Sequence, residues 1–191
     1  MAFKRLWHTL RLYTIRRANA RAKYLREKCI YAGIGENVEI LSRKIPLYAS
    51  LIKIGNNVSI ASSVGFLTHD VTHTVLNRMG IGKYQEIVGC IEICDNVFIG
   101  AGTRIMYNTR IGPNAIVAAG SIVTKDVLPN SVVAGVPARV IYDLDTYLAK
   151  RNSLSKNHFK PSQLSAWAIK EEVSPELAQW AWDEFYKTRT K

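Results

Sequence analysis

The sequence has 191 residues, of which 48% are hydrophobic, so its length and composition suit one domain with appended segments. No segment reaches the roughly 18 consecutive apolar residues that a membrane-spanning helix needs, and no apolar stretch follows the charged start, as a secretory signal would require. The formal net charge of +11 is concentrated in residues 1–30, which hold nine basic side chains and one acidic residue, Glu27. We therefore expect residues 1–30 to be the part of the protein that binds an anionic partner.

Residues 1–30 are predicted to form a basic amphipathic helix that runs from residue 3 to about residue 28. Its apolar stripe consists of Phe3, Leu6, Trp7, Leu10 and Tyr13. The repeats further along the chain predict a solenoid, whose open end needs a cap, so we expect the stripe to pack against the solenoid or a neighbouring subunit. The alternative is peripheral contact with an anionic membrane face, and the two roles can coexist. No nucleic-acid-binding module is visible, so nucleic acid is not an expected partner.

The main domain is predicted to span residues 31–142, and its first two coils open at Ile34 and Ile54. A coil of such a solenoid is made of three six-residue repeats, which are described below. The interval between Ile34 and Ile54 is two positions longer than one coil, which predicts an enlarged corner near Pro46. The six-residue spacing continues from Ile54 to Phe66. It then breaks, because the interval from Ile54 to Ile93 is not a multiple of six. A loop at about 67–90 therefore leaves the solenoid, and long loops on a regular scaffold usually carry function.

The stretch from Ile93 to Leu128 repeats with a period of six, which fits neither a helix nor a simple alternating strand. Its aliphatic anchors are Ile93, Ile99, Ile105, Ile111, Val117 and Val123, and four positions after each come the small or β-branched Val97, Thr103, Thr109, Ala115, Ser121 and Val127. If three hexads make one triangular turn, residues three hexads apart stack at the sheet spacing of about 4.8 Å. The period therefore predicts a mainly β solenoid in which anchors stack on anchors.

Residues 143–191 are predicted to form a helical extension after the repeat ends. We expect a short helix from Asp143 to about Arg151 over the end of the solenoid, a linker at 156–161, and a helix at 161–172. A last helix is expected from Ser174, the predicted N-cap, to Lys187. Its apolar face predicts subunit or end-cap packing.

Cys29, Cys90 and Cys94 are odd in number and match no zinc or disulfide spacing, which favours a reducing, cytoplasmic compartment. Cys90 and Cys94 could ligate a metal in principle. We expect buried free thiols instead, and no metal site.

The stretches "FLTHD", "IEICDNVFIGAGTRI", "IGPNAIVAAGSIVTKDV" and "GVPARVI" together resemble the hexapeptide-repeat acyltransferases. The similarity is to the galactoside and maltose O-acetyltransferases and to their small relatives in bacterial surface-polysaccharide pathways, and it covers about residues 34–141. It implies a left-handed parallel β-helix, a homotrimer, and transfer of an acetyl group from acetyl-CoA to a sugar hydroxyl.

The resemblance and the loop position together suggest site residues. His69 is the expected general base, because a neutral imidazole near pH 7 has a suitable pKa. Asp70 is expected to orient that imidazole if the backbone turns there, and His73 to contact the acceptor. The resemblance further implies that the coenzyme meets Phe98, Ala101, Ala119, Ser121, Thr124, Lys125 and Arg139, with Lys125 and Arg139 offering charges for its phosphates.

Three other functions fit the same scaffold. The first is N-acylation of an amino sugar. The second is a zinc carbonic anhydrase with His69 and His73 as ligands, which would need a third convergent histidine, while His8 and His158 lie in terminal segments. The third is a non-enzymatic scaffold. For the leading function we expect a cytoplasmic protein, peripheral at the inner membrane face if the N-terminal helix binds lipid.

Overall fold

The structure is a computed structural model that describes residues 2–158, 175–187 and 189. The chain divides into two compact units, Met1–Asp145 and Thr146–Lys191. The first unit contains every strand of the described chain, and the described part of the second is mainly helical.

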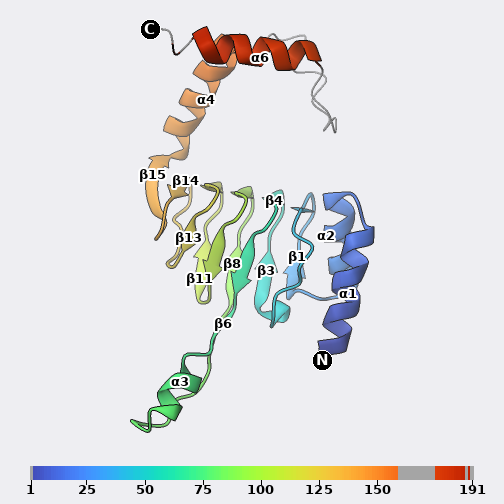
Figure 1. The fold of residues 1–191 in the computed structure, drawn as a ribbon, viewed down its shortest axis with the longest axis vertical. Coiled ribbons are helices and arrows are strands. Elements are labelled where there is room, and N and C mark those ends of the chain that lie inside the picture. Colours follow the sequence, from blue (N-terminus) through green and yellow to red (C-terminus); the bar gives the residue numbers. More distant parts are fainter. Residues whose placement is uncertain (1, 159–174, 188, 190–191) are drawn as a thin grey trace. The chain divides into compact units, whose positions relative to one another are not determined.

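The first unit is a stack of coils whose strands form three mainly parallel sheets (Figure 1). One sheet contains β1 (Gly33–Ile34), β3 (Ile52–Ile54), β8 (Ile91–Ile93) and β11 (Thr109–Ile111). A second contains β5 (Gly65–Leu67), β10 (Arg104–Met106) and β13 (Ile122–Val123). The third contains β2 (Glu39–Ile40), β4 (Val58–Ile60), β9 (Val97–Ile99), β12 (Ala115–Val117), β14 (Ser131–Ala134) and β15 (Arg139–Asp143). Within these three sheets, only β15 pairs with its neighbour antiparallel among the described strands.

The strand register confirms the period of six. Ile93 pairs with Ile111, Ile99 with Val117 and Ile105 with Val123, so anchors three hexads apart lie in register. The predicted longer intervals are also present, because Ile34 pairs with Ile54 and Ile54 pairs with Ile93.

The core of this unit is a column of the predicted anchors and of the small residues between them. All six anchors from Ile93 to Val123 are at most 1% exposed. The buried polar members Thr103, Thr109 and Ser121 satisfy their hydroxyl groups on backbone carbonyls, so these polar atoms inside the column have partners.

Asparagines shape one corner of the stack, a feature that the period of six does not predict. Asn57, Asn96, Asn114 and Asn130 all have positive φ, and their side chains form a hydrogen-bonded ladder from coil to coil. Asparagine tolerates the left-handed conformation better than most residues, and its amide can donate and accept at once. The ladder therefore fixes the corner and joins neighbouring coils.

The loop leaves the stack after β5, as predicted, and returns to it at β8. Its base is an antiparallel pair of β6 (His69–Asp70) and β7 (Ile87–Val88), and its far part contains α3 (His73–Arg78). Figure 1 shows this hairpin projecting away from the coils. Thr68 anchors its base, because the buried hydroxyl of Thr68 donates to the carbonyl of Leu47 at 2.7 Å.

The prediction of one helix over residues 3–28 is wrong, because the segment forms α1 (Ala2–Thr14) and α2 (Ala18–Glu27). Buried Arg21 explains the break between them. Its Nη1 donates to the carbonyls of Ile15 and Arg16, and its Nε donates to the carbonyl of Ile40 in β2. Since those carbonyls bond the guanidinium, the chain turns at the break.

The apolar stripe of α1 does not cap the solenoid of its own chain, contrary to one form of the prediction. Its five members, Phe3, Leu6, Trp7, Leu10 and Tyr13, are between 56% and 82% exposed. The cap is α2, which packs on β1 and β2 and buries Ala22 and Leu25, with Leu12 of α1 added to the core. The stripe is therefore left exposed in the described part of the chain.

The second unit contains most of α4 (Leu144–His158) and α6 (Pro175–Lys187). Because α4 continues to His158, the helix is longer than predicted. The predicted linker at 156–161 therefore begins before the helix ends. The last helix is confirmed, while the predicted helix at 161–172 and the Ser174 cap lie outside the described residues. Within the described ranges, no helix is both long enough and apolar enough to cross a bilayer.

Candidate functional site

His69 begins β6, at the point where the chain leaves the coils. It lines a groove of about 670 Å³ that runs along the outward face of β5, beside the enlarged corner at residues 41–47. The imidazole is half-buried, and its Nδ1 atom is buried without a hydrogen-bond partner among the described residues. A buried ring nitrogen of this kind needs an explanation, and a missing reaction partner is one.

Asp70 does not orient the imidazole of His69. Its Oδ1 instead accepts a hydrogen bond of 2.7 Å from the backbone N–H of Thr72, before α3. The hydrogen bonds from Thr72 hold the pKa of the Asp70 carboxyl below its usual range, with smaller contributions from His73 and His69. The expected pairing is therefore absent, because this carboxylate accepts from the backbone N–H of Thr72 instead.

His73 is the first residue of α3 and does not line the groove. Its Nδ1 atom is also buried without a partner in the described chain. The structure thus places His73 at the start of α3, outside the groove that contains His69.

Tyr48 is a neighbour of His69 that the sequence motifs did not reveal. Its ring meets the imidazole edge-on, with centroids 5.2 Å apart. Its hydroxyl donates weakly to the carboxylate of Glu86 at 3.3 Å, and the charge of Glu86 raises the pKa of the Tyr48 phenol. Tyr48 lies outside the motifs that carry the family resemblance. The one sequence signal in its region was the extra length of the corner near Pro46.

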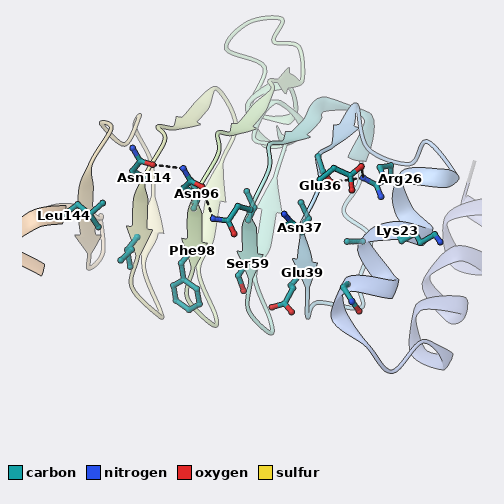
Figure 2. Close-up of a pocket in the computed structure, with 18 residues that line it drawn as sticks. Lys23, Arg26, Glu36, Asn37, Glu39, Ser59, Asn96, Phe98, Asn114 and Leu144 are labelled. Carbon is teal, nitrogen blue, oxygen red and sulfur yellow. Dashed lines mark hydrogen bonds and ion pairs between the residues drawn. The ribbon is translucent and has the colours of Figure 1, made fainter. Parts of the chain in front are cut away.

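Phe98, the first of the expected coenzyme contacts, lies in a different groove, shown in Figure 2. This groove of about 750 Å³ runs along the outward face of the sheet that contains β4, β9 and β12, and α2 closes one end with Lys23 and Arg26. It is the larger of the two grooves, but no described histidine lines it. Phe98 is 44% exposed in the groove and is therefore available for contact.

The other expected coenzyme residues lie along the corners of the stack. Ala101 and Ala119 occupy the same corner in successive coils, where the N–H of Gly120 donates to the carbonyl of Ala101 at 2.8 Å. Arg139 is near this edge, because it pairs with Ala134 at the end of β14. Thr124 and Lys125 follow β13 and are exposed.

Ser121 differs from the expectation, because its side chain is fully buried. The hydroxyl donates to the carbonyl of Ala118 at 2.7 Å inside the column. Ser121 therefore shapes the corner next to Ala119 and offers no hydroxyl to a ligand.

The three cysteines are free, but Cys29 and Cys90 are exposed and Cys94 is half-buried, so the prediction of buried thiols at Cys90 and Cys94 is wrong. The Sγ atom of Cys94 accepts a hydrogen bond from Nε of Arg110. In the described part of the chain, no three His, Cys, Asp or Glu side chains converge as a metal site would require.

Comparisons with known proteins match the coils. Residues 90–125 match the family model "Bacterial transferase hexapeptide (six repeats)". The chain is 38% identical to the galactoside O-acetyltransferase of Escherichia coli over 96 residues. This matched stretch covers 49% of this chain and 45% of that enzyme. The chain thus spans about half the length of several curated relatives that it matches.

Two solved structures are similar over most of their length. One is a maltose O-acetyltransferase from Clostridium difficile, with a TM-score of 0.56 and 28% identity, covering 75% of this chain and 87% of that one. The other is a galactoside acetyltransferase in complex with coenzyme A, with a TM-score of 0.55 and 29% identity, covering 84% of this chain and 87% of that one.

Proposed function

We propose that this chain, whose coils carry the hexapeptide repeat of bacterial transferases, is an acetyl-CoA-dependent O-acetyltransferase that acts on a saccharide hydroxyl. The position of His69 carries the proposal. It stands at the base of the ejected hairpin, in a groove, with one ring nitrogen unpartnered among the described residues. Similar enzymes are named for galactosides and maltose, and one was solved with coenzyme A. The coils are then those of a left-handed parallel β-helix.

In this mechanism His69 removes the proton of the acceptor hydroxyl as its oxygen attacks the thioester carbonyl. A carbon–oxygen bond forms, and the tetrahedral intermediate collapses with cleavage of the carbon–sulfur bond. The imidazolium returns the proton to the leaving thiolate, so the products are the acetyl ester and coenzyme A. Tyr48 limits the tilt of the imidazole through its edge-on contact.

The separation of the two grooves supports a homotrimer as the active form. Phe98 and His69 line different grooves of one chain, so a donor site that needs both requires a second subunit. A three-sided stack offers flat faces for three-fold closure. Light scattering should give about three times 21.4 kDa, and a monomeric mass at micromolar concentration would contradict the proposed assembly.

The exposed stripe of α1 supports a place at the inner face of the membrane. It lies beside basic side chains, and residues 1–26 contain no acidic residue. A polysaccharide precursor on a lipid carrier would lie at the same surface, so we place the enzyme in the cytoplasm as a peripheral protein in surface-polysaccharide synthesis.

The test is thiol release from acetyl-CoA with a panel of sugars, amino sugars and sugar nucleotides, with product analysis to separate O- from N-acetylation. His69→Ala should lower kcat by roughly 10²- to 10⁴-fold with little change in acetyl-CoA affinity. His8→Gln is the matched control, since that histidine lines neither groove. No release with any acceptor, together with no coenzyme binding by calorimetry, would refute the proposal.

A further inference from the structure

The groove around His69 is strongly basic. Arg5 of α1, Arg43 and Lys44 of the enlarged corner, and Arg104 of β10 line it, while none of its described lining residues is Asp or Glu. Four cations therefore border the groove that contains the proposed base, and they come from three separate stretches of the chain.

These charges are not neutralised by the described protein. Across the described ranges, none of the four residues forms an ion pair with a carboxylate. Arg104 is fixed by backbone carbonyls, since its Nη1 donates to the carbonyl of Ser63 at 2.7 Å and to that of Gly102 at 3.1 Å. The guanidinium of Arg43 stands over the ring of Tyr13, 6.0 Å from the centroid. Arg104 and Arg43 are thus positioned without a counter-charge.

The high net charge of the chain does not explain this pattern. The groove that contains Phe98 has Lys23 and Arg26 at one end, but Glu36 and Glu39 also line it, and Arg26 pairs with Glu36. Of the two grooves, only that of His69 combines cations with an absence of described lining carboxylates. Positive charge is therefore concentrated where the acceptor would lie.

We propose that the acceptor is an anionic saccharide, whose phosphate or diphosphate binds Arg43, Lys44 and Arg5 while its hydroxyl faces His69. This assignment rests on the proposed acetyl transfer and names its substrate class. Guanidinium and ammonium groups recognise phosphate oxygens by charge-assisted hydrogen bonds, and a groove without carboxylates repels no anion. A soluble sugar nucleotide and a lipid-linked sugar diphosphate share this chemistry.

The kinetic test compares galactose, galactose 1-phosphate, UDP-galactose and a short-chain prenyl diphosphate galactose as acceptors. We expect kcat/KM to be at least about tenfold higher for the phosphorylated acceptors than for galactose, and Arg43→Gln with Lys44→Gln to reduce that ratio about tenfold. Lys53→Gln removes a charge outside both grooves and should leave the ratio unchanged. The relative rates of the nucleotide and prenyl acceptors identify the source of the anion.

A binding test covers the case in which no panel sugar is a substrate. Pyrophosphate is titrated by calorimetry into the protein saturated with coenzyme A, so that the phosphate sites of the coenzyme are already filled. We expect one site, weakened about tenfold by the Arg43→Gln, Lys44→Gln pair and unaffected by Lys53→Gln. The absence of binding at millimolar pyrophosphate would overturn the proposal.

Two outcomes separate this inference from the proposed function. If galactose and galactose 1-phosphate are acetylated equally well, the enzyme is an acetyltransferase but the anionic acceptor is wrong. If the double variant raises KM for acetyl-CoA and not for the acceptor, the cations serve the coenzyme and the inference is also wrong. Failure of the acetyltransferase assignment itself would appear as a lack of both coenzyme binding and acetyl transfer.

Discussion

Tyr48 and His69 meet edge-on at the base of the hairpin, with ring centroids 5.2 Å apart and ring planes at 76°. Tyr48 reaches this position in the left-handed backbone conformation, with φ of +52°, which an aromatic residue seldom adopts. Its hydroxyl points to Glu86, just before the returning strand of the hairpin. One strained corner residue therefore links both sides of the loop base to the proposed catalytic histidine.

Replacement of Tyr48 should reveal this positioning role. Tyr48→Ala removes the edge contact and should lower kcat about fivefold, because such aromatic contacts contribute on the order of 1 kcal/mol. Tyr48→Phe keeps the ring and should stay within about threefold of the parent enzyme. The measurement is kcat and KM for acetyl-CoA in both variants, and equal losses in the two would mean that the hydroxyl matters and the ring does not.

Gly100 should be intolerant of any side chain because the next coil lies against it. A Cβ atom at this position would come within 2.3 Å of the backbone nitrogen of Ala119. We expect Gly100→Ala to cost about 1–3 kcal/mol of unfolding free energy, seen as a melting temperature lower by several degrees. Gly33→Ala is the control, since the nearest atom there is 3.7 Å away on the flexible side chain of Lys53. Similar melting temperatures for the two variants would contradict this close approach of the coils.

Acidification should destabilise the contact between α1 and α2. Burial, and then the charges of Lys4 and Lys28, hold the pKa of His8 below its usual range, and its Nδ1 lies 2.7 Å from the hydroxyl of Tyr24. Because the unfolded chain binds the proton more readily, stability should fall as pH drops below the ordinary histidine value of about 6.5. The melting temperature should fall less between pH 7.5 and 5.5 in His8→Gln than in the parent, and parallel curves would exclude this cause.

The stripe of α1 should matter for lipid binding and not for the fold of its own chain. Trp7 and Leu10 are 62% and 56% exposed, so replacing both with Ser should leave the melting temperature unchanged. The same change should abolish sedimentation with anionic liposomes, which should also weaken at high salt because the basic residues contribute electrostatically. A smaller oligomer in light scattering would instead show that the stripe packs on a neighbouring subunit.

Much of the first unit could be predicted from the sequence, because the core residues of a coiled repeat recur at a constant interval. The stacking of Ile93 on Ile111 and of Ile99 on Val117 follows from the period of six. The phase break after Phe66 likewise predicted the ejected hairpin and placed His69 at its base. These features depend on residues close in sequence or at a constant interval, and such patterns are readable without coordinates.

Tertiary structure decided where side chains without a periodic position would point. The guanidinium of Arg21 bonds carbonyls at the helix break and on β2, so one predicted helix becomes two. Asp70 bonds Thr72 and not His69, because the carboxylate satisfies the nearby backbone N–H. Tyr48 reaches His69 only because the enlarged corner brings two residues distant in the sequence together. Each of these side chains had several possible hydrogen-bond partners or neighbours. Which one it contacts depends on backbone angles and distances that are set only when the chain folds.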